Sequence, residues 1–277
     1  MKIDMKLVKE LNDATGAGLM ACKKALEEAE GDVKGAEKIL KEKGLASVAK
    51  RADKAAGEGR IFIKQNGNKI AIVELVCETD FVANGEGFIA CGEEICKTIF
   101  EKGYTKIEQE LSDMALDYAT RVHENMSLKS VEVIDVPAGA TAGMYVHSDN
   151  KTGSVVIIKG SEADAVKVFA KDCCMHLAAF TPAYITKDEI PESYIAEQKE
   201  IFLAKMNNDE KMASKPDNVK EGIIAGQIKK HLAEISFVDQ GFVKDPAKTV
   251  SAKLAEVGKE VGADLSFGYC KVIVLGK

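Results

Sequence analysis

The pattern that most constrains the fold is a strand, a turn, a second strand and a helix, which occurs twice along the chain. In the first copy, Asn66-Gly67 favours a tight hairpin turn between strands predicted at 60–64 and 70–76. The second of these strands is almost entirely apolar, which is typical of a central strand buried on both faces. The second copy is predicted to place its strand, turn and return strand at 144–147, 149–153 and 154–158.

A helix and a closing strand complete each copy. Apolar residues at helical spacing predict one helix from Phe88 to Ile99 and another from Val166 to Leu177, the latter capped by Ser161. The remaining core elements are a further helix and two closing strands, expected at about 107–125, 131–136 and 265–275. The predicted fold class is therefore α+β, with a duplicated core of antiparallel sheets and helices.

A helical segment precedes the duplication. Residues 1–54 predict a three-helix module, because apolar residues recur every three or four positions and Gly31-Asp32 ends one helix and caps the next. Its third helix is expected to end at Gly44. A linker rich in Ala and Lys, with helical tendency, is expected to follow at 45–57.

An insertion in the second copy predicts an antiparallel helical hairpin. Two stretches with apolar residues at helical spacing are separated by Ser214-Lys215-Pro216-Asp217, in which Pro216 suits the first turn of a helix. The predicted domains are a helical module at 1–54, a first core subdomain at 55–140 and a second core subdomain at 141–277, which contains this hairpin.

Charge and hydropathy exclude several classes of function. Lys and Arg total 38 against 44 Asp and Glu, and the net charge of −6 argues against a general nucleic-acid binder, because neutralising phosphates needs a basic surface. No apolar run reaches the roughly 18 residues that span a bilayer, and no secretory signal is expected. The 7 cysteines lack the spacing of a disulfide framework, so the reducing cytoplasm is the expected compartment.

No catalytic or metal site is predicted. Cys173, Cys174 and His176 cluster in the sequence, but a structural zinc needs four ligands and Cys173 falls on an apolar helix face. Buried thiols are therefore favoured over a metal site. The glycine-rich turn at 15–18 follows a helix rather than a strand, so a helix–helix turn is favoured over a phosphate cradle. We expect neither a cofactor nor enzymatic chemistry.

The two copies differ where the return strand leads into the helix. The first copy carries about four extra residues there, in the stretch Glu78-Thr79-Asp80-Phe81-Val82. In one alternative, which the bare sequence favours, Asp80 caps a helix and Phe81 packs inward. In the other, Phe81 points outward as an anchor for an apolar pocket of a partner. The second alternative gains support because the other copy is expected to fold without these residues.

Several motifs resemble the bacterial elongation factor Ts family. The stretches that carry the resemblance are VKEL at 8–11, TGAGLM at 15–20, CKKAL at 22–26, EGD at 30–32, ETDFVA at 78–83 and PAKTV at 246–250. The resemblance extends from about Lys6 to Val274. It implies a ubiquitin-associated-like (UBA-like) fold for the N-terminal module and a coiled coil for the hairpin, at about 187–227.

The resemblance also implies a function. The family is the guanine-nucleotide exchange factor for elongation factor Tu, the GTPase that carries aminoacyl-tRNA to the ribosome. The stretch Thr79, Asp80, Phe81 and Val82 matches the family's segment that displaces Mg²⁺ from the nucleotide bound to that partner. No direct contact with nucleic acid or with a membrane is expected. Further contacts with the partner are expected at Leu19, Met20 and His147.

Alternatives remain open from the sequence. Leu19 and Met20 fit the core of the helical module as well as they fit a partner contact. The chain could instead be a scaffold whose helical module binds a partner without exchange activity, or a small-molecule enzyme on an α+β core. Capture of a stoichiometric GTPase would favour exchange, and turnover without any GTPase would favour an enzyme.

Overall fold

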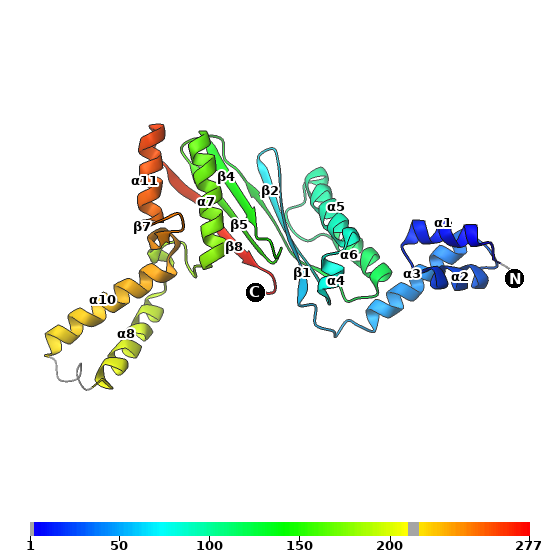
Figure 1. The fold of residues 1–277 in the computed structure, drawn as a ribbon, viewed down its shortest axis with the longest axis horizontal. Coiled ribbons are helices and arrows are strands. Elements are labelled where there is room, and N and C mark those ends of the chain that lie inside the picture. Colours follow the sequence, from blue (N-terminus) through cyan, green and yellow to red (C-terminus); the bar gives the residue numbers. More distant parts are fainter. Residues whose placement is uncertain (1–2, 210–215) are drawn as a thin grey trace. The chain divides into compact units, whose positions relative to one another are not determined.

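The structure is a computed structural model that describes residues 3–209 and 216–277 as a mixture of helices and small antiparallel sheets (Figure 1). The predicted α+β class is confirmed. The chain divides into two compact units: the first consists of Met1–Val136, Val146–Gly153 and Ile273–Lys277, and the second of Pro137–Tyr145 and Ser154–Val272. The domain division at 54 and 140 stays a prediction.

The sheet of the first unit has β2 (Lys69–Cys77) at its centre, between β1 (Glu58–Asn66) and β3 (Ser127–Asp135). Both pairings are antiparallel, with Ile72 opposite Ile63 on β1. Every β2 side chain after the first is buried. The predicted central strand is thus confirmed, and its apolar sequence follows from having no solvent-facing side.

Helices α5 (Glu86–Lys102) and α6 (Gln109–Val122) pack with this sheet. Gly92 of α5 lies against the ring of Phe62 on β1, where a Cβ atom would come within 2.2 Å of the ring. Only glycine allows the helix to approach the strand so closely. The largest fully buried side chains of this core are Leu75, Phe88, Ile95, Ile99 and Leu111.

The N-terminal module consists of α1 (Met5–Thr15), α2 (Leu19–Glu28) and α3 (Val33–Ala49). The Asp32 carboxylate accepts the backbone N–H of Gly35 at 2.9 Å, so the predicted cap is confirmed. The three helices enclose a small apolar core of their own. Its fully buried members are Val8, Leu11, Cys22, Ala25, Leu26 and Ala36.

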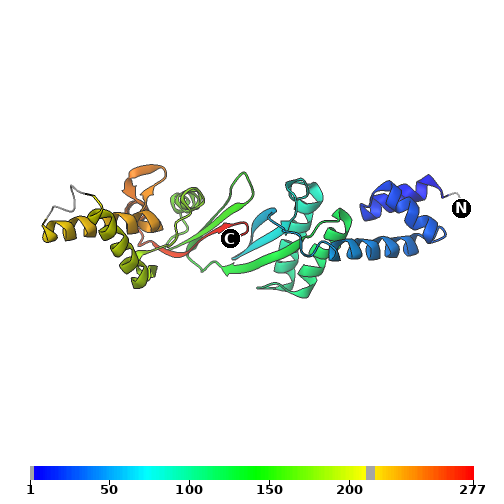
Figure 2. The ribbon, with the colours of Figure 1, turned by 90° about the horizontal axis from the view of Figure 1, so that it is seen from below.

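The prediction that the third helix ends at Gly44 is wrong, because α3 continues to Ala49 (Figure 2). Gly44 is buried where α3 meets α6. A Cβ atom on Gly44 would lie 2.6 Å from the Cβ atom of Thr120 and 2.7 Å from its carbonyl oxygen. This glycine therefore permits a close helix–helix approach instead of ending a helix, and the segment predicted as a linker is helical up to Ala49.

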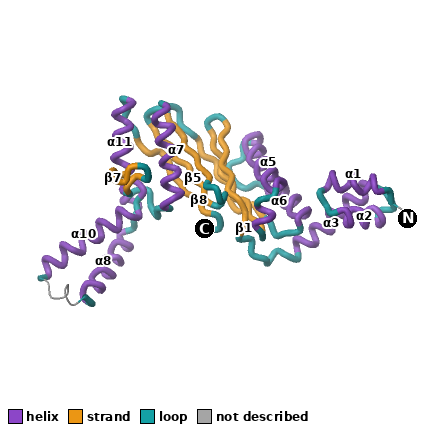
Figure 3. The backbone as a smooth tube through the Cα atoms, viewed as in Figure 1, coloured by secondary structure: helices purple, strands orange, loops and turns teal. Residues whose placement is uncertain are grey.

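The second unit is built around a sheet with the order β4-β5-β8, next to the long helix α7 (Figure 3). The strands are β4 (Ala140–Val146), β5 (Thr152–Lys159) and β8 (Ser266–Val274), and the helix α7 spans Asp164–Phe180. Both sheets thus place a return strand between its hairpin partner and the closing strand, as the duplication predicts. The predicted cap at Ser161 is wrong: α7 begins after Ala163, whose N–H donates to the Ser161 hydroxyl at 3.2 Å.

The insertion forms the helices α8 (Glu192–Asn207) and α10 (Asp217–Ile235), which contact each other as a hairpin. Pro216 stands directly before α10 as its capping residue, and the other predicted connecting residues, 214 and 215, lie outside the described residues. The shorter elements near the hairpin are η1 (Lys187–Glu189), η2 (Phe237–Asp239), β6 (Gly241–Phe242), β7 (Asp245–Thr249) and α11 (Val250–Val261). None of the helices in the described part of the chain combines the length and the apolar character that crossing a membrane requires.

The contact at Gly44 predicts opposite effects for two glycine-to-alanine changes. Alanine favours a helix over glycine by about 1 kcal/mol, but at Gly44 the added methyl group overlaps Thr120, and such overpacking costs about 1–3 kcal/mol. We expect Gly44→Ala to lower the free energy of unfolding. The matched control is Gly222→Ala on α10, where no atom lies within 4 Å of the new Cβ, and stability should rise or stay unchanged. Urea denaturation followed by circular dichroism measures both, and equal effects would contradict the packing argument.

Candidate functional site

The candidate site is the junction between β2 and α5. Residues 78–85 form this link and include the short helix α4 (Asp80–Ala83), whereas the corresponding link between β5 and α7 comprises only residues 160–163. The residue that caps α4 is Thr79, whose hydroxyl accepts the N–H of Val82 at 3.4 Å. The alternative in which Asp80 is the cap is wrong, because Asp80 is already the first residue of the helix.

Phe81 points away from the interior of the first unit. Its side chain is 86% exposed, the largest value among the exposed large apolar side chains in the described part of the chain. On the other side of the same helical turn, Ala83 is buried and Val82 packs against the apolar core. The alternative in which Phe81 packs inward is therefore wrong. An exposed aromatic ring on an ordered turn contributes little to folding and is typical of an interaction surface.

Two carboxylates hold this turn in place. Glu124, in the loop after α6, accepts the backbone N–H groups of Glu78 and Thr79, both at 3.1 Å, and the Thr79 hydroxyl at 2.6 Å. Glu78 in return accepts the backbone N–H of Asn125 and the guanidinium of Arg51, both at 2.6 Å. We call the Glu78–Glu124 pair the carboxylate clamp. No local pattern in the sequence points to this pair, since Thr79 and Glu124 lie 45 residues apart.

The hairpin tip that carries His147 belongs to the same unit and lies beside β1. A backbone N–H of β1 donates to the carbonyl of Asn150 at 2.8 Å, and Lys151 forms an ion pair with Glu58 on β1. The hydrogen bond to Glu58 raises the pKa of the Lys151 ammonium, and the charge of Asp80 adds to this rise. The exposed His147 and the α4 turn therefore lie on neighbouring segments of one unit.

Leu19 and Met20 lie in the helical module, at the start of α2. Their side chains are 50% and 67% exposed, and the core of the module is built from other residues of α1, α2 and α3. The alternative in which both pack in the core is therefore wrong. The structure leaves them available for a contact, at a part of the unit distinct from the α4 turn.

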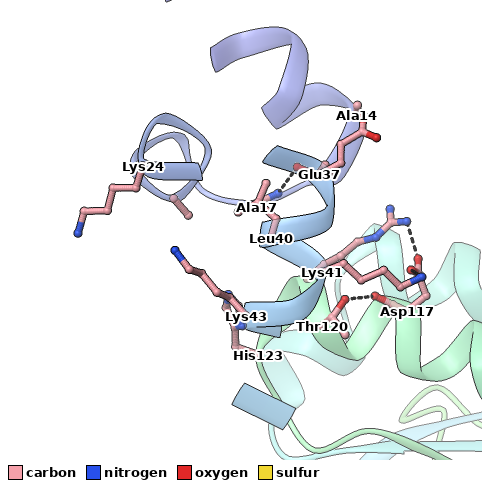
Figure 4. A pocket seen from close by; sticks show the side chains of 13 residues that line it. Ala14, Ala17, Lys24, Glu37, Leu40, Lys41, Lys43, Asp117, Thr120 and His123 are labelled. Carbon is pink, nitrogen blue, oxygen red and sulfur yellow. Dashed lines mark hydrogen bonds and ion pairs between the residues drawn. The ribbon is translucent and has the colours of Figure 1, made fainter. Parts of the chain in front are cut away.

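A cavity of about 480 Å³ lies between the helical module and α6 (Figure 4). Basic side chains line it, but carboxylates already match several of them. Lys41 and Arg121 reach Asp117 at 3.6 and 2.7 Å, and Lys43 reaches Glu28 at 2.6 Å. Because Lys41 and Arg121 share the single carboxylate of Asp117, these ion pairs compensate only part of the basic charge that lines the cavity.

The Cys173, Cys174 and His176 cluster is part of the core of the second unit. Burial raises the pKa of the Cys174 thiol to about 12 and raises that of Cys173 further, so both are neutral buried thiols as predicted. The Nε2 atom of His176 lies 2.8 Å from the amide oxygen of Gln240, and its Nδ1 atom accepts the N–H of Val243 at 3.1 Å. Both ring nitrogens are thus occupied, and no group of metal-ligating side chains occurs within residues 3–209 and 216–277.

Comparison with known proteins defines the class. The family model described as "Elongation factor TS" matches residues 78–270. Three similar relatives are all named elongation factor Ts. The protein of Treponema denticola is 50% identical and that of Treponema pallidum 44%, each covering 100% of this chain and 99% of the relative. The protein of Borreliella burgdorferi is 35% identical over 97% of both chains.

The duplicated α+β core and these matches define a translation elongation factor, which acts in protein biosynthesis. The chain belongs to the elongation factor Ts family. Its ETDFVA motif, at 78–83, coincides with the turn that presents Phe81.

The buried His176 predicts a loss of stability at acidic pH. Burial lowers the pKa of His176 below its ordinary value of 6.5, against a smaller opposing effect of the Gln240 hydrogen bond. Below about pH 6.5 the unfolded chain takes up a proton that the folded protein excludes, so stability falls as the pH falls towards the folded-state pKa. At about pH 5.5 the loss reaches at most about 1.4 kcal/mol.

Urea denaturation near pH 7.5 and pH 5.5 measures this dependence. We expect His176→Gln to reduce the difference between the two pH values. The control is His123→Asn, at an exposed residue with a positive φ that Asn tolerates, and it should leave the difference unchanged. An unaltered pH dependence in His176→Gln would refute the assignment.

Proposed function

We propose that this protein is the guanine-nucleotide exchange factor for elongation factor Tu and promotes GDP release from that GTPase during translation elongation in the cytoplasm. The observation that carries the proposal is the 86% exposed ring of Phe81 on a capped turn within the family's ETDFVA motif. An exchange factor acts by binding alone and needs no nucleophile or general base. We therefore propose that the chain is not an enzyme with bond-making chemistry of its own.

Exchange requires differential binding. The factor must bind the nucleotide-free GTPase more tightly than the GDP-bound form, and linkage then lowers the affinity for GDP by the same ratio. Each tenfold change corresponds to about 1.4 kcal/mol. Burying one Phe side chain contributes roughly 1.5–3 kcal/mol. Burial of Phe81 can therefore account for a roughly 10- to 100-fold reduction in the affinity for GDP. Any larger reduction must come from a wider interface.

In this proposal Phe81 inserts into an apolar pocket between helices of the GTPase. Asp80, exposed beside it, hydrogen-bonds to nearby groups of the partner. Thr79 holds the turn by capping α4, and Val82 holds it by packing against the apolar core. The helix displaced in the partner withdraws a loop that supports Mg²⁺. Without Mg²⁺ the charge of the diphosphate is less neutralised, and GDP dissociates faster.

Three further residues are proposed as contacts of the same partner. Leu19 and Met20 offer an exposed apolar pair on the helical module. His147 is exposed on the hairpin tip beside β1, in the same unit as Phe81. A second contact of this kind would supply part of the binding free energy that Phe81 alone lacks.

Truncating the Phe81 ring should slow exchange without unfolding the protein. Because the ring is exposed, Phe81→Ala should leave the thermal midpoint of unfolding unchanged. It should slow release of a fluorescent GDP from elongation factor Tu by roughly 10- to 100-fold, from the apolar area it would bury.

A matched control removes another exposed apolar side chain. Val168 on α7 is 60% exposed, and Val168→Ala should exchange at the wild-type rate. A wild-type rate for a folded Phe81→Ala protein would contradict the proposed role of the ring. Absence of any acceleration by the wild-type protein would contradict the exchange function itself.

A further inference from the structure

We infer that Glu124 is a positioning residue for exchange, which presents Phe81 in a fixed orientation through the carboxylate clamp. The inference rests on the proposed function, because it concerns the same turn. Glu124 lies 45 positions from Thr79 in the sequence and outside the ETDFVA motif. Its carboxylate nevertheless accepts hydrogen bonds from two consecutive residues of that motif.

The clamp supplies what a helix of this length lacks. With only the residues Asp80–Ala83, α4 is too short to be stable by its own hydrogen bonds. Glu124 binds the backbone just before the helix, through the N–H groups of Glu78 and Thr79. It also holds the Thr79 hydroxyl at 2.6 Å, and the same hydroxyl oxygen caps the helix by accepting the Val82 N–H. The orientation of the helix is thereby tied to one carboxylate.

A buried thiol at the end of β2 makes a further hydrogen bond to the turn. The Cys77 Sγ–H donates to the carbonyl oxygen of Thr79 at 3.2 Å. Burial raises the pKa of this thiol to about 12, and the charge of Glu124 contributes to the rise. The thiol therefore keeps its proton and remains a hydrogen-bond donor to the turn.

Glu78, the other carboxylate of the clamp, connects the turn to the segment that follows α3. Glu78 accepts the N–H of Asn125, the residue next to Glu124. The Asn125 side chain donates to the carbonyl oxygens of Ala52 and Lys54, at 3.3 and 2.7 Å. The turn, the loop after α6 and the chain leaving α3 thus share one hydrogen-bond network.

This arrangement predicts a specific kinetic signature. A flexible turn would still let the protein dock through its other contacts, but it would have to be ordered each time Phe81 inserts. Loss of the clamp should therefore lower the maximal exchange rate more than it raises the concentration of factor at half-maximal rate. A role in overall folding alone would instead lower the fraction of active protein and leave both constants unchanged per folded molecule.

The test compares Glu124→Met with wild type in release of a fluorescent GDP from elongation factor Tu. Methionine keeps the length of the side chain but removes both acceptor oxygens, and we expect the maximal rate to fall roughly 3- to 10-fold. Glu124→Gln keeps one acceptor oxygen and should recover most of the rate. Asp113→Asn, an exposed carboxylate on α6 outside the clamp, is the matched control and should exchange as wild type.

A double variant separates positioning from independent contact. If Glu124 acts through Phe81, the combination of Glu124→Met with Phe81→Ala should be no slower than Phe81→Ala alone. Hydrogen exchange should also show faster exchange of the Val82 and Ala83 amide protons in Glu124→Met. Should that variant fail to fold, Thr79→Val carries the same cycle, because it removes the hydroxyl that donates to Glu124 at 2.6 Å and caps α4 by accepting the Val82 N–H.

The outcomes distinguish two failures. If Phe81→Ala slows exchange while the folded Glu124→Met protein exchanges as wild type, or if the two losses multiply, the positioning inference is overturned and the proposed function stands. If Phe81→Ala itself exchanges as wild type, the proposed role of the turn fails and the inference fails with it.

Discussion

The burial of the central strand β2 is the constraint on which the candidate site depends. A strand hydrogen-bonded on both edges, with every side chain after the first buried, is held in one register, because a shift by one residue would exchange its two faces. The point where the chain leaves β2, at Cys77, is therefore fixed. Residues 78–83 start from a rigid support, and the clamp converts that support into a fixed direction for Phe81.

The two copies of the core separate what the fold needs from what the function needs. Each copy carries a hairpin, a central return strand, a helix and a closing strand. In one copy residues 160–163 suffice to join strand and helix, so the extra helix in the other link is not required by this architecture. Exposed residues that the fold does not require are candidates for binding a partner. The exposed Phe81 and the internal hydrogen bonds of its turn agree with that division.

The sequence predicted the parts of the fold that depend on local pattern. Apolar alternation, the Asn66-Gly67 turn and helical spacing located the strands and most helices, and the extra residues at 78–82 located the candidate site. The errors arose where distant contacts decide. Gly44 looks like a helix end but allows α3 to approach Thr120, and Phe81 looks like a core residue but is exposed. The role of Glu124 could not be predicted from the sequence, because Glu124 and the turn it binds are distant in the sequence and meet only in the folded chain.

The path of the chain through the two units has one more consequence. The backbone returns to the first unit at 146–153 and again at 273–277, where the N–H of Leu275 donates to Lys151 and that of Gly276 to the buried Glu74. Neither unit is thus encoded by one continuous stretch of sequence. Because the first unit includes residues near both ends of the chain, any single cut of the gene would remove part of that unit, and the two units cannot be expressed as two separate continuous fragments.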